Sequence, residues 1–269
     1  MASRPAAIPR PPRRTAGTGR RLVWLAVAVG VGAIYWHAWD DIGGSLGSLF
    51  GSLGNLGDLL RRSTPPNTDV FHESVDASIV TLDTALIGTT IGLALSLLIT
   101  PFAARNLSPH RLVYESARVV IAITRTIPSF IFALYMVVVV GLGPYPVALA
   151  LAIHSVGTLG KLFAETIEDM DRGTVEALRT AGAGRIQVFV HGVLPEVAPT
   201  FVSLSLYRLD VNIRAGSVLG IAGAGGIGFL IYNSIQLFQY REVTTELLVL
   251  LALILIVERI SSILRSRIA

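Results

Sequence analysis

The chain of 269 residues is 52% hydrophobic and only 15% charged, with a mean hydropathy of +0.64. Soluble domains carry about 25% charged residues, so this composition excludes an ordinary soluble fold and predicts an all-α integral membrane protein. The lack of cysteine excludes disulfides and thiolate metal sites. The net charge of +4 does not indicate nucleic-acid binding, because basic patches interleaved with aromatic residues are absent.

Six segments are apolar enough to cross a bilayer, which takes about 20 helical residues. They are residues 22–39, 78–103, 119–142, 146–163, 199–222 and 243–263. The first ends in Tyr35, Trp36 and Trp39, as expected at a membrane interface. Because it lacks a small-residue cleavage pattern, we interpret it as an uncleaved anchor rather than a signal peptide.

The positive residues are distributed unevenly between the segments that join these spans. Of 22 lysines and arginines, sixteen fall on the side of the N-terminus, three lie within spans, and three (Arg61, Arg62 and Arg241) lie on the other side. Cytoplasmic segments are enriched in positive residues. We therefore expect both termini in the cytoplasm and a multi-pass protein of the plasma (inner) membrane.

This topology divides the chain into parts. Residues 1–21 form a basic Pro/Arg-rich cytoplasmic tail, 22–39 the first transmembrane helix, 40–77 an extracytoplasmic segment, 78–263 the transmembrane core, and 264–269 a cytoplasmic C-terminus. Leucines recur at helical spacing in residues 42–62, which indicates an amphipathic helix on the outer surface. A flexible glycine-rich linker is the open alternative for that stretch.

The longest cytoplasmic loop, residues 164–198, carries the most informative pattern. Thr174 is expected to cap a short amphipathic helix, Gly182 to bend or end it, and Pro195 to end a second helical run. Glu176 and Arg179 share one face of the first helix, and apolar side chains line another. Because an apolar helix face is unfavourable in contact with the aqueous cytoplasm, this loop is expected to bind a protein partner.

The spacing of the loop resembles the EAA loop of ABC-importer permeases, which couples transport to an ATPase. The matching residues are Glu176, Ala177, Leu178, Arg179, Gly182, Leu194 and Pro195. Two positions depart from the pattern, with Leu178 in place of alanine and Gly192 in place of a common isoleucine. Residues 124–130, 192–199 and 207–229 are similar to the PhnE-type permeases of phosphonate importers, and the similarity covers roughly residues 75–265.

The resemblance implies a type I (MetI-like) permease that contributes no catalysis and binds no cofactor itself. ATP and Mg²⁺ would be bound by a separate ATPase, present in two copies below a permease homodimer. An extracytoplasmic phosphonate- or phosphate-binding protein would deliver the substrate above. The run SVGTLGKL at residues 155–162 is consistent with this division, because it lacks the first glycine and the Ser/Thr of a phosphate loop.

A second group of residues forms a hypothetical translocation path or gate, on the reasoning that charges within spans face cavities or one another. They are Arg125, Arg208, Asp210, Arg214, Gly223, Gly225, Gly226 and Gly228. Asp210 and Arg214 are spaced as an i, i+4 ion pair. Structural pairing of the charges and helix packing by the glycines are the open alternatives. The glycines also match the dinucleotide-binding pattern, but without its strand–helix setting.

One functional alternative belongs to a different class. An ion-gradient-driven transporter or channel would use Asp83, Asp210 or Glu258 as a proton relay within the membrane. It predicts uptake without an ATPase. The five histidines show no metal-ligand spacing, so a metal site is not expected.

Overall fold

The computed structural model describes residues 18–43, 46–223 and 225–268, and these contain helices and no strand. The chain separates into two parts, residues 1–59 and 60–269. The first part contains α1 (Thr18–Asp41), α2 (Leu46–Gly51) and most of α3 (Leu53–Ser63). The described side chains of α1 are exposed along its whole length, as befits a helix whose surroundings are lipid.

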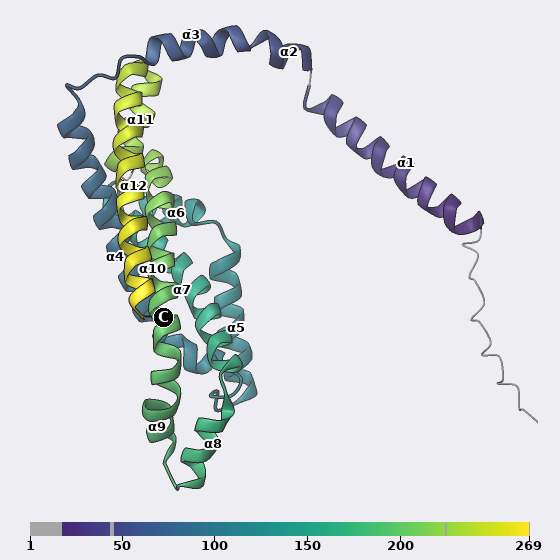
Figure 1. The fold of residues 1–269 in the computed structure, drawn as a ribbon, viewed down its shortest axis with the longest axis vertical. Coiled ribbons are helices and arrows are strands. Elements are labelled where there is room, and N and C mark those ends of the chain that lie inside the picture. Colours follow the sequence, from purple (N-terminus) through teal and green to yellow (C-terminus); the bar gives the residue numbers. More distant parts are fainter. Residues whose placement is uncertain (1–17, 44–45, 224, 269) are drawn as a thin grey trace, which may run out of the picture. The chain divides into compact units, whose positions relative to one another are not determined.

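The second part is a helical bundle (Figure 1). Its helices are α4 (Phe71–Ala103), α5 (Arg111–Thr126), α6 (Ser129–Val140), α7 (Pro144–Asp169), α8 (Arg172–Thr180), α9 (Arg185–Val188), the π-helix η1 (Phe189–Val193), α10 (Leu194–Leu219), the 3₁₀-helix η2 (Gly220–Ala222), α11 (Gly226–Gln236) and α12 (Tyr240–Ile268). The short helices α8 and α9 lie at one end of the bundle, and α11 lies at the other (Figure 1).

Within the described residues, five helices are long and apolar enough to cross a membrane, and α5 with α6 makes a sixth span if the pair is counted as one. This confirms the predicted all-α, multi-pass architecture of about six spans. The third span, expected over residues 119–142, is divided into two helices. The chain bends by 91° between α5 and α6, at Pro128, because proline has no N–H to donate and disfavours a helical residue before it.

The buried face of α4 is its polar face. Hydroxyl residues such as Ser78, Thr89, Ser96 and Thr100 are buried, whereas Leu98 is exposed. Each of these hydroxyls donates to the carbonyl four residues earlier, at 2.6–2.7 Å. This arrangement suits a helix in lipid, where apolar side chains face outward and polar groups must be satisfied within the protein.

Glycines set the close approach of α4 to α7. A Cβ atom built on Gly88 would lie 2.8 Å from the carbonyl oxygen of Ala148, and one on Gly92 would lie 2.5 Å from the Cβ atom of Ser155. Small residues four apart allow two membrane helices to pack backbone to backbone. The helix α7 therefore forms the centre of the bundle, and it leads directly into the cytoplasmic loop.

Candidate functional site

The loop predicted to couple transport is a helical hairpin between α7 and α10. The helix α8 is capped by Asp171, whose carboxylate accepts from Gly173 N–H at 2.9 Å. The backbone N–H of Asp171 in turn donates to Glu196 Oε1 at 3.1 Å. The expectation that Thr174 caps this helix was wrong, because Thr174 lies inside α8. Asp171 is favoured because both its carboxylate and its N–H find partners.

The hairpin turns at Gly182, as the sequence predicts, and at Gly184, which follows it. Gly182 has φ +82°, a left-handed conformation that favours glycine at a helix C-terminus. Its N–H donates to Arg179 O at 3.0 Å, and Ala183 N–H donates to Leu178 O at 3.0 Å. Gly184 N–H donates to the Gln187 side chain at 2.8 Å. The turn is thus fixed by local hydrogen bonds.

The two departures from the family pattern contact each other. A Cβ atom on Gly192 would lie 2.9 Å from Leu178 Cδ1, so the leucine of α8 occupies the space that a larger residue in η1 would need. Val175 of α8 packs beside it against a buried cluster that includes Val193. The larger side chain of Leu178 therefore fills the space left by Gly192, and α8 packs against the start of α10.

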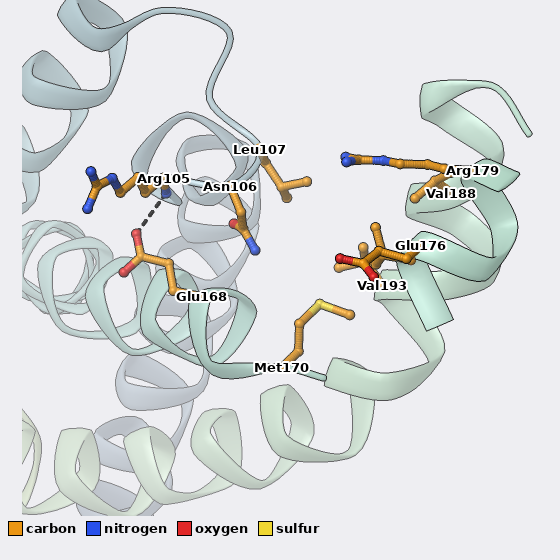
Figure 2. A pocket seen from close by; sticks show the side chains of 10 residues that line it. Arg105, Asn106, Leu107, Glu168, Met170, Glu176, Arg179, Val188 and Val193 are labelled. Carbon is orange, nitrogen blue, oxygen red and sulfur yellow. Dashed lines mark hydrogen bonds between the residues drawn. The ribbon is translucent and has the colours of Figure 1, made fainter. Parts of the chain in front are cut away.

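Glu176 and Arg179 of α8 point into a cleft that separates the hairpin from the bundle (Figure 2). The cleft has a volume of about 630 Å³. Asn106 and Leu107 of the loop between α4 and α5 lie across it, and Met170 lies between the two sides (Figure 2). The hairpin therefore touches the bundle through its base, and the cleft leaves room beside Glu176.

Glu168 fixes the opposite wall of the cleft. Arg118 Nη2 of α5 lies 2.8 Å from both Glu168 carboxylate oxygens, and Arg105 N–H donates to Oε1 at 2.7 Å (Figure 2). Arg118 Nε also donates to Ala103 O at 3.0 Å. One carboxylate on the last turn of α7 thus joins the ends of α4 and α5 immediately before the hairpin begins.

An exposed apolar residue lies near the tip of the hairpin. This is the end of the bundle that the charge distribution assigns to the cytoplasm. The Ile186 side chain of α9 is 80% exposed. Glu176, Ala177 and Arg179 are exposed as well, and so are Leu194 and Pro195 at the start of α10. Ile186 thus adds an apolar side chain to an exposed surface that also carries Glu176 and Arg179.

The glycine region at the outer end acts in helix packing. Gly223, Gly225 and Gly226 have φ of +93°, +73° and +70°, and a Cβ atom on Gly228 would overlap the carbonyl oxygen of Ser217. The Ile227 N–H donates to a threonine hydroxyl of α4 at 3.1 Å. These contacts let α11 fold back against α10, and a gating role of the same glycines stays a prediction.

The predicted pair of Asp210 and Arg214 does not form. Asp210 accepts from Ser261 Oγ at 2.9 Å and lies 3.5 Å from Arg265 Nη2, both on α12. Arg214 lies 3.3 Å from Glu258 Oε2, also on α12. Adjacent helices therefore supply the partners that the local spacing assigned within one helix. Of the three candidate carboxylates for a proton relay, Asp210 and Glu258 each lie beside an arginine.

The remaining path candidates occupy different surroundings. Arg208 is buried, and its Nε donates to Ser155 Oγ of α7 at 2.9 Å. Arg125, on the last turn of α5, is exposed, and so is Asp83 on α4. The spans thus hold one buried arginine and several charges at their surface.

Comparison with known proteins decides the family. The model of the family described as "binding-protein-dependent transport system inner membrane component" matches residues 86–269. The chain belongs to this family. The permease is 42% identical over 218 residues to the phosphite transport system permease protein PtxC of Stutzerimonas stutzeri, covering 81% of this chain and 79% of that one.

Two other relatives of the permease carry related names. It is 39% identical over 210 residues to the phosphate-import permease protein PhnE of Mycolicibacterium smegmatis, covering 78% of this chain and 40% of that longer one. It is 44% identical over 103 residues to the putative cryptic phosphonate transport system permease protein PhnE2 of Escherichia coli, covering 38% and 84%.

Solved importers share the fold of the permease. The inward-facing MetNI methionine ABC transporter aligns with a TM-score of 0.64 at 20% identity, covering 77% of this chain and 99% of that one. A bacterial alginate ABC importer aligns with a TM-score of 0.56 at 17% identity, covering 90% and 96%. These likenesses confirm the predicted MetI-like architecture of a type I importer permease.

Three features of the permease were missed by reasoning from the sequence. The Glu168 anchor was missed because its partners lie 50 and 63 residues away. Ile186 was not singled out, although an isoleucine beside the Gly182 turn is a local signal that would have marked it. The capping role of Asp171 was assigned to Thr174, three residues along.

Proposed function

We propose that this permease is the membrane subunit of an ATP-driven importer for phosphonate or a related phosphorus oxyanion such as phosphite or phosphate. The supporting observation is the group of relatives at 39–44% identity, whose names refer to phosphite, phosphate and phosphonate transport. These anions share a tetrahedral PO₃ group, so a site adapted to one is chemically suited to the others. Within the homodimer, the permease forms the translocation path.

The α8–α9 hairpin is the part that we assign to ATPase coupling. Glu176, Ala177 and Arg179 are exposed on α8, and Ile186 is exposed at the tip. Closure of two ATPase subunits on binding ATP and Mg²⁺ would push this hairpin. The push would reach the bundle through Leu178, which rests on Gly192 at the base of α10. The cleft beside Glu176 gives the hairpin space to move.

Coupling is tested by Glu176→Ala and Gly182→Asp in the complete complex with ATPase and binding protein. Truncating a charged group at a protein interface costs about 2–5 kcal/mol, so uptake should fall at least about tenfold while the permease still inserts. Glu115→Ala is the matched control, because Glu115 is exposed in the predicted cytoplasmic end of α5 and lies 3.9 Å from Arg111. Unchanged uptake by both hairpin variants would contradict the coupling role.

Two further measurements test the assembly and the substrate. The ATPase should co-purify with the permease in a mild detergent, and uptake without any ATPase would favour the ion-gradient alternative. Titration of the cognate binding protein with phosphate, phosphite and alkylphosphonates should show which anion is carried. A binding protein that binds none of these three kinds of anion would refute the proposed substrate class.

A further inference from the structure

Arg208 is a buried cation without a negative partner. It is 5% exposed, and no carboxylate lies within 4.0 Å of it in the described part of the chain. The other two arginines of the spans differ, because Arg214 pairs with Glu258 and Arg125 is exposed. A charge in the membrane interior is costly unless it is paired or faces a polar cavity. Arg208 therefore requires a further explanation.

One edge of the Arg208 guanidinium is held by three helices. Its Nε donates to Ser155 Oγ of α7 at 2.9 Å. The Asn212 amide of α10 donates to the same hydroxyl at 3.0 Å and to Thr89 Oγ1 of α4 at 2.8 Å. The Ser155 hydroxyl donates its own proton to Leu151 O at 2.6 Å. This network fixes the direction of the guanidinium and adds no negative charge.

The other edge of the guanidinium is available. No hydrogen bond from either Nη atom of Arg208 to another described residue is present; its bond is through Nε alone. The fully buried side-chain atoms without a partner, within the described residues, are Asn212 Oδ1 and Glu246 Oε2. The Nη atoms also have no partner in the described segments but do not belong to this fully buried group, so they are partly accessible. Their two parallel N–H groups match the oxygens of a tetrahedral oxyanion.

A histidine lies next to Ser155 on α7. This histidine, His154, is half-buried. Its Nδ1 lies 3.3 Å from the Thr124 carbonyl oxygen on the last turn of α5. The chain then breaks by 91° before α6 begins at Ser129. Broken membrane helices are a recurring setting for substrate sites of transporters.

We infer that Arg208 is a transient binding residue for the transported oxyanion, with Ser155 and Asn212 acting as positioning residues. The inference rests on the proposed function, and its ligand class is a phosphorus oxyanion with a PO₃ group. A single guanidinium held by neutral groups binds such an anion weakly, which suits a step from which the anion must be released. Arg214, neutralised by Glu258, has no such role.

The test uses the complete complex of permease, ATPase and binding protein in liposomes, with inorganic phosphate, phosphite and methylphosphonate as probes. Arg208→Gln should lower uptake at least about tenfold while binding-protein-stimulated ATP hydrolysis stays within about twofold. Arg208→Lys keeps a point charge without the planar fork and should give intermediate uptake. Lys161→Gln is the matched control, because Lys161 lies in α7 and is paired with Glu165 at 3.3 Å.

Three results would overturn the inference. The first is uptake by Arg208→Gln equal to that of the wild type. The second is a parallel fall of uptake and ATP hydrolysis with a less stable complex, which would assign Arg208 a structural role. The third applies if the complex with Arg208→Gln does not assemble. Uptake by Arg208→Lys equal to that of the wild type would then overturn the inference. A wild-type complex that takes up none of the three anions would instead refute the proposed function itself.

Discussion

Replacing Glu168 by glutamine removes the charge that joins α4, α5 and α7 above the hairpin. Glu168 and Arg118 are about a quarter exposed, with 25% and 24% of their side-chain surfaces accessible. Hydrogen bonds to charged groups contribute about 1.5–3 kcal/mol each, and Arg118 keeps its bond to Ala103 O. After allowance for partial exposure, we expect a loss of about 2 kcal/mol, or about 4–8 °C in Tm for a chain of this size.

The control for this prediction lies one turn earlier on the same helix. Glu165 pairs with Lys161 at 3.3 Å, and both side chains are more than a third exposed. An exposed pair of this spacing is worth about 0.3–0.5 kcal/mol, so Glu165→Gln should lower Tm by less than about 2 °C. Thermal unfolding of the purified permease in detergent measures both variants. Equal shifts for the two glutamates, or none for Glu168→Gln, would refute the anchoring role.

Two further predictions concern glycines. Gly192→Ile should destabilise the permease by about 1–3 kcal/mol through overpacking against Leu178, and adding Leu178→Ala should recover most of that loss; additive losses in thermal unfolding would contradict the compensation. Gly228→Ala should abolish the folded peak in size-exclusion chromatography because the new methyl group overlaps a carbonyl of α10. Gly30→Ala should keep the folded peak, because a Cβ atom on Gly30 would have no neighbour within 4 Å. Equal elution profiles of the two variants would contradict the packing argument.

The spans and the hairpin were predictable because their signals are local. Hydropathy over about 20 residues marks a span, and the distribution of arginines assigns its orientation. Gly182 could be identified as the turn because a left-handed residue after a helix favours glycine. Pro128 lies where the third span is interrupted by the 91° bend, and a proline is the local sequence signal for such a break.

The ion pairs of Asp210 and Arg214 were not predictable, because both depend on which helices become neighbours. Asp210 has an arginine four residues away in sequence, yet it faces Arg265 on α12. Arg214 likewise turns to Glu258. Spacing along one helix describes only what an isolated helix offers. For these two residues, the partner that lies across the helix interface replaces the one on the same helix.

The buried hydroxyl groups of α4 donate to carbonyl groups of the same helix, and this affects how α4 can move against its neighbours. In the described residues, α4 is hydrogen-bonded to α10 and α11 through Thr89 and Thr81, but no hydrogen bond joins α4 directly to α7. Sliding of α4 along α7 where Gly88 and Gly92 pack would therefore disturb dispersion contacts, which are individually small, and the few hydrogen bonds that link the two helices indirectly. These are the Asn212 bridge between Thr89 and Ser155 and the bond of Glu168 just beyond the end of α4. The ion pairs of α10 with α12 resist such slippage. The α4–α7 interface is thus held by close packing and a few bridging hydrogen bonds, whereas the α10–α12 interface is held by ion pairs. Under the proposed coupling role, a push on the hairpin would meet less electrostatic resistance between α4 and α7 than between α10 and α12.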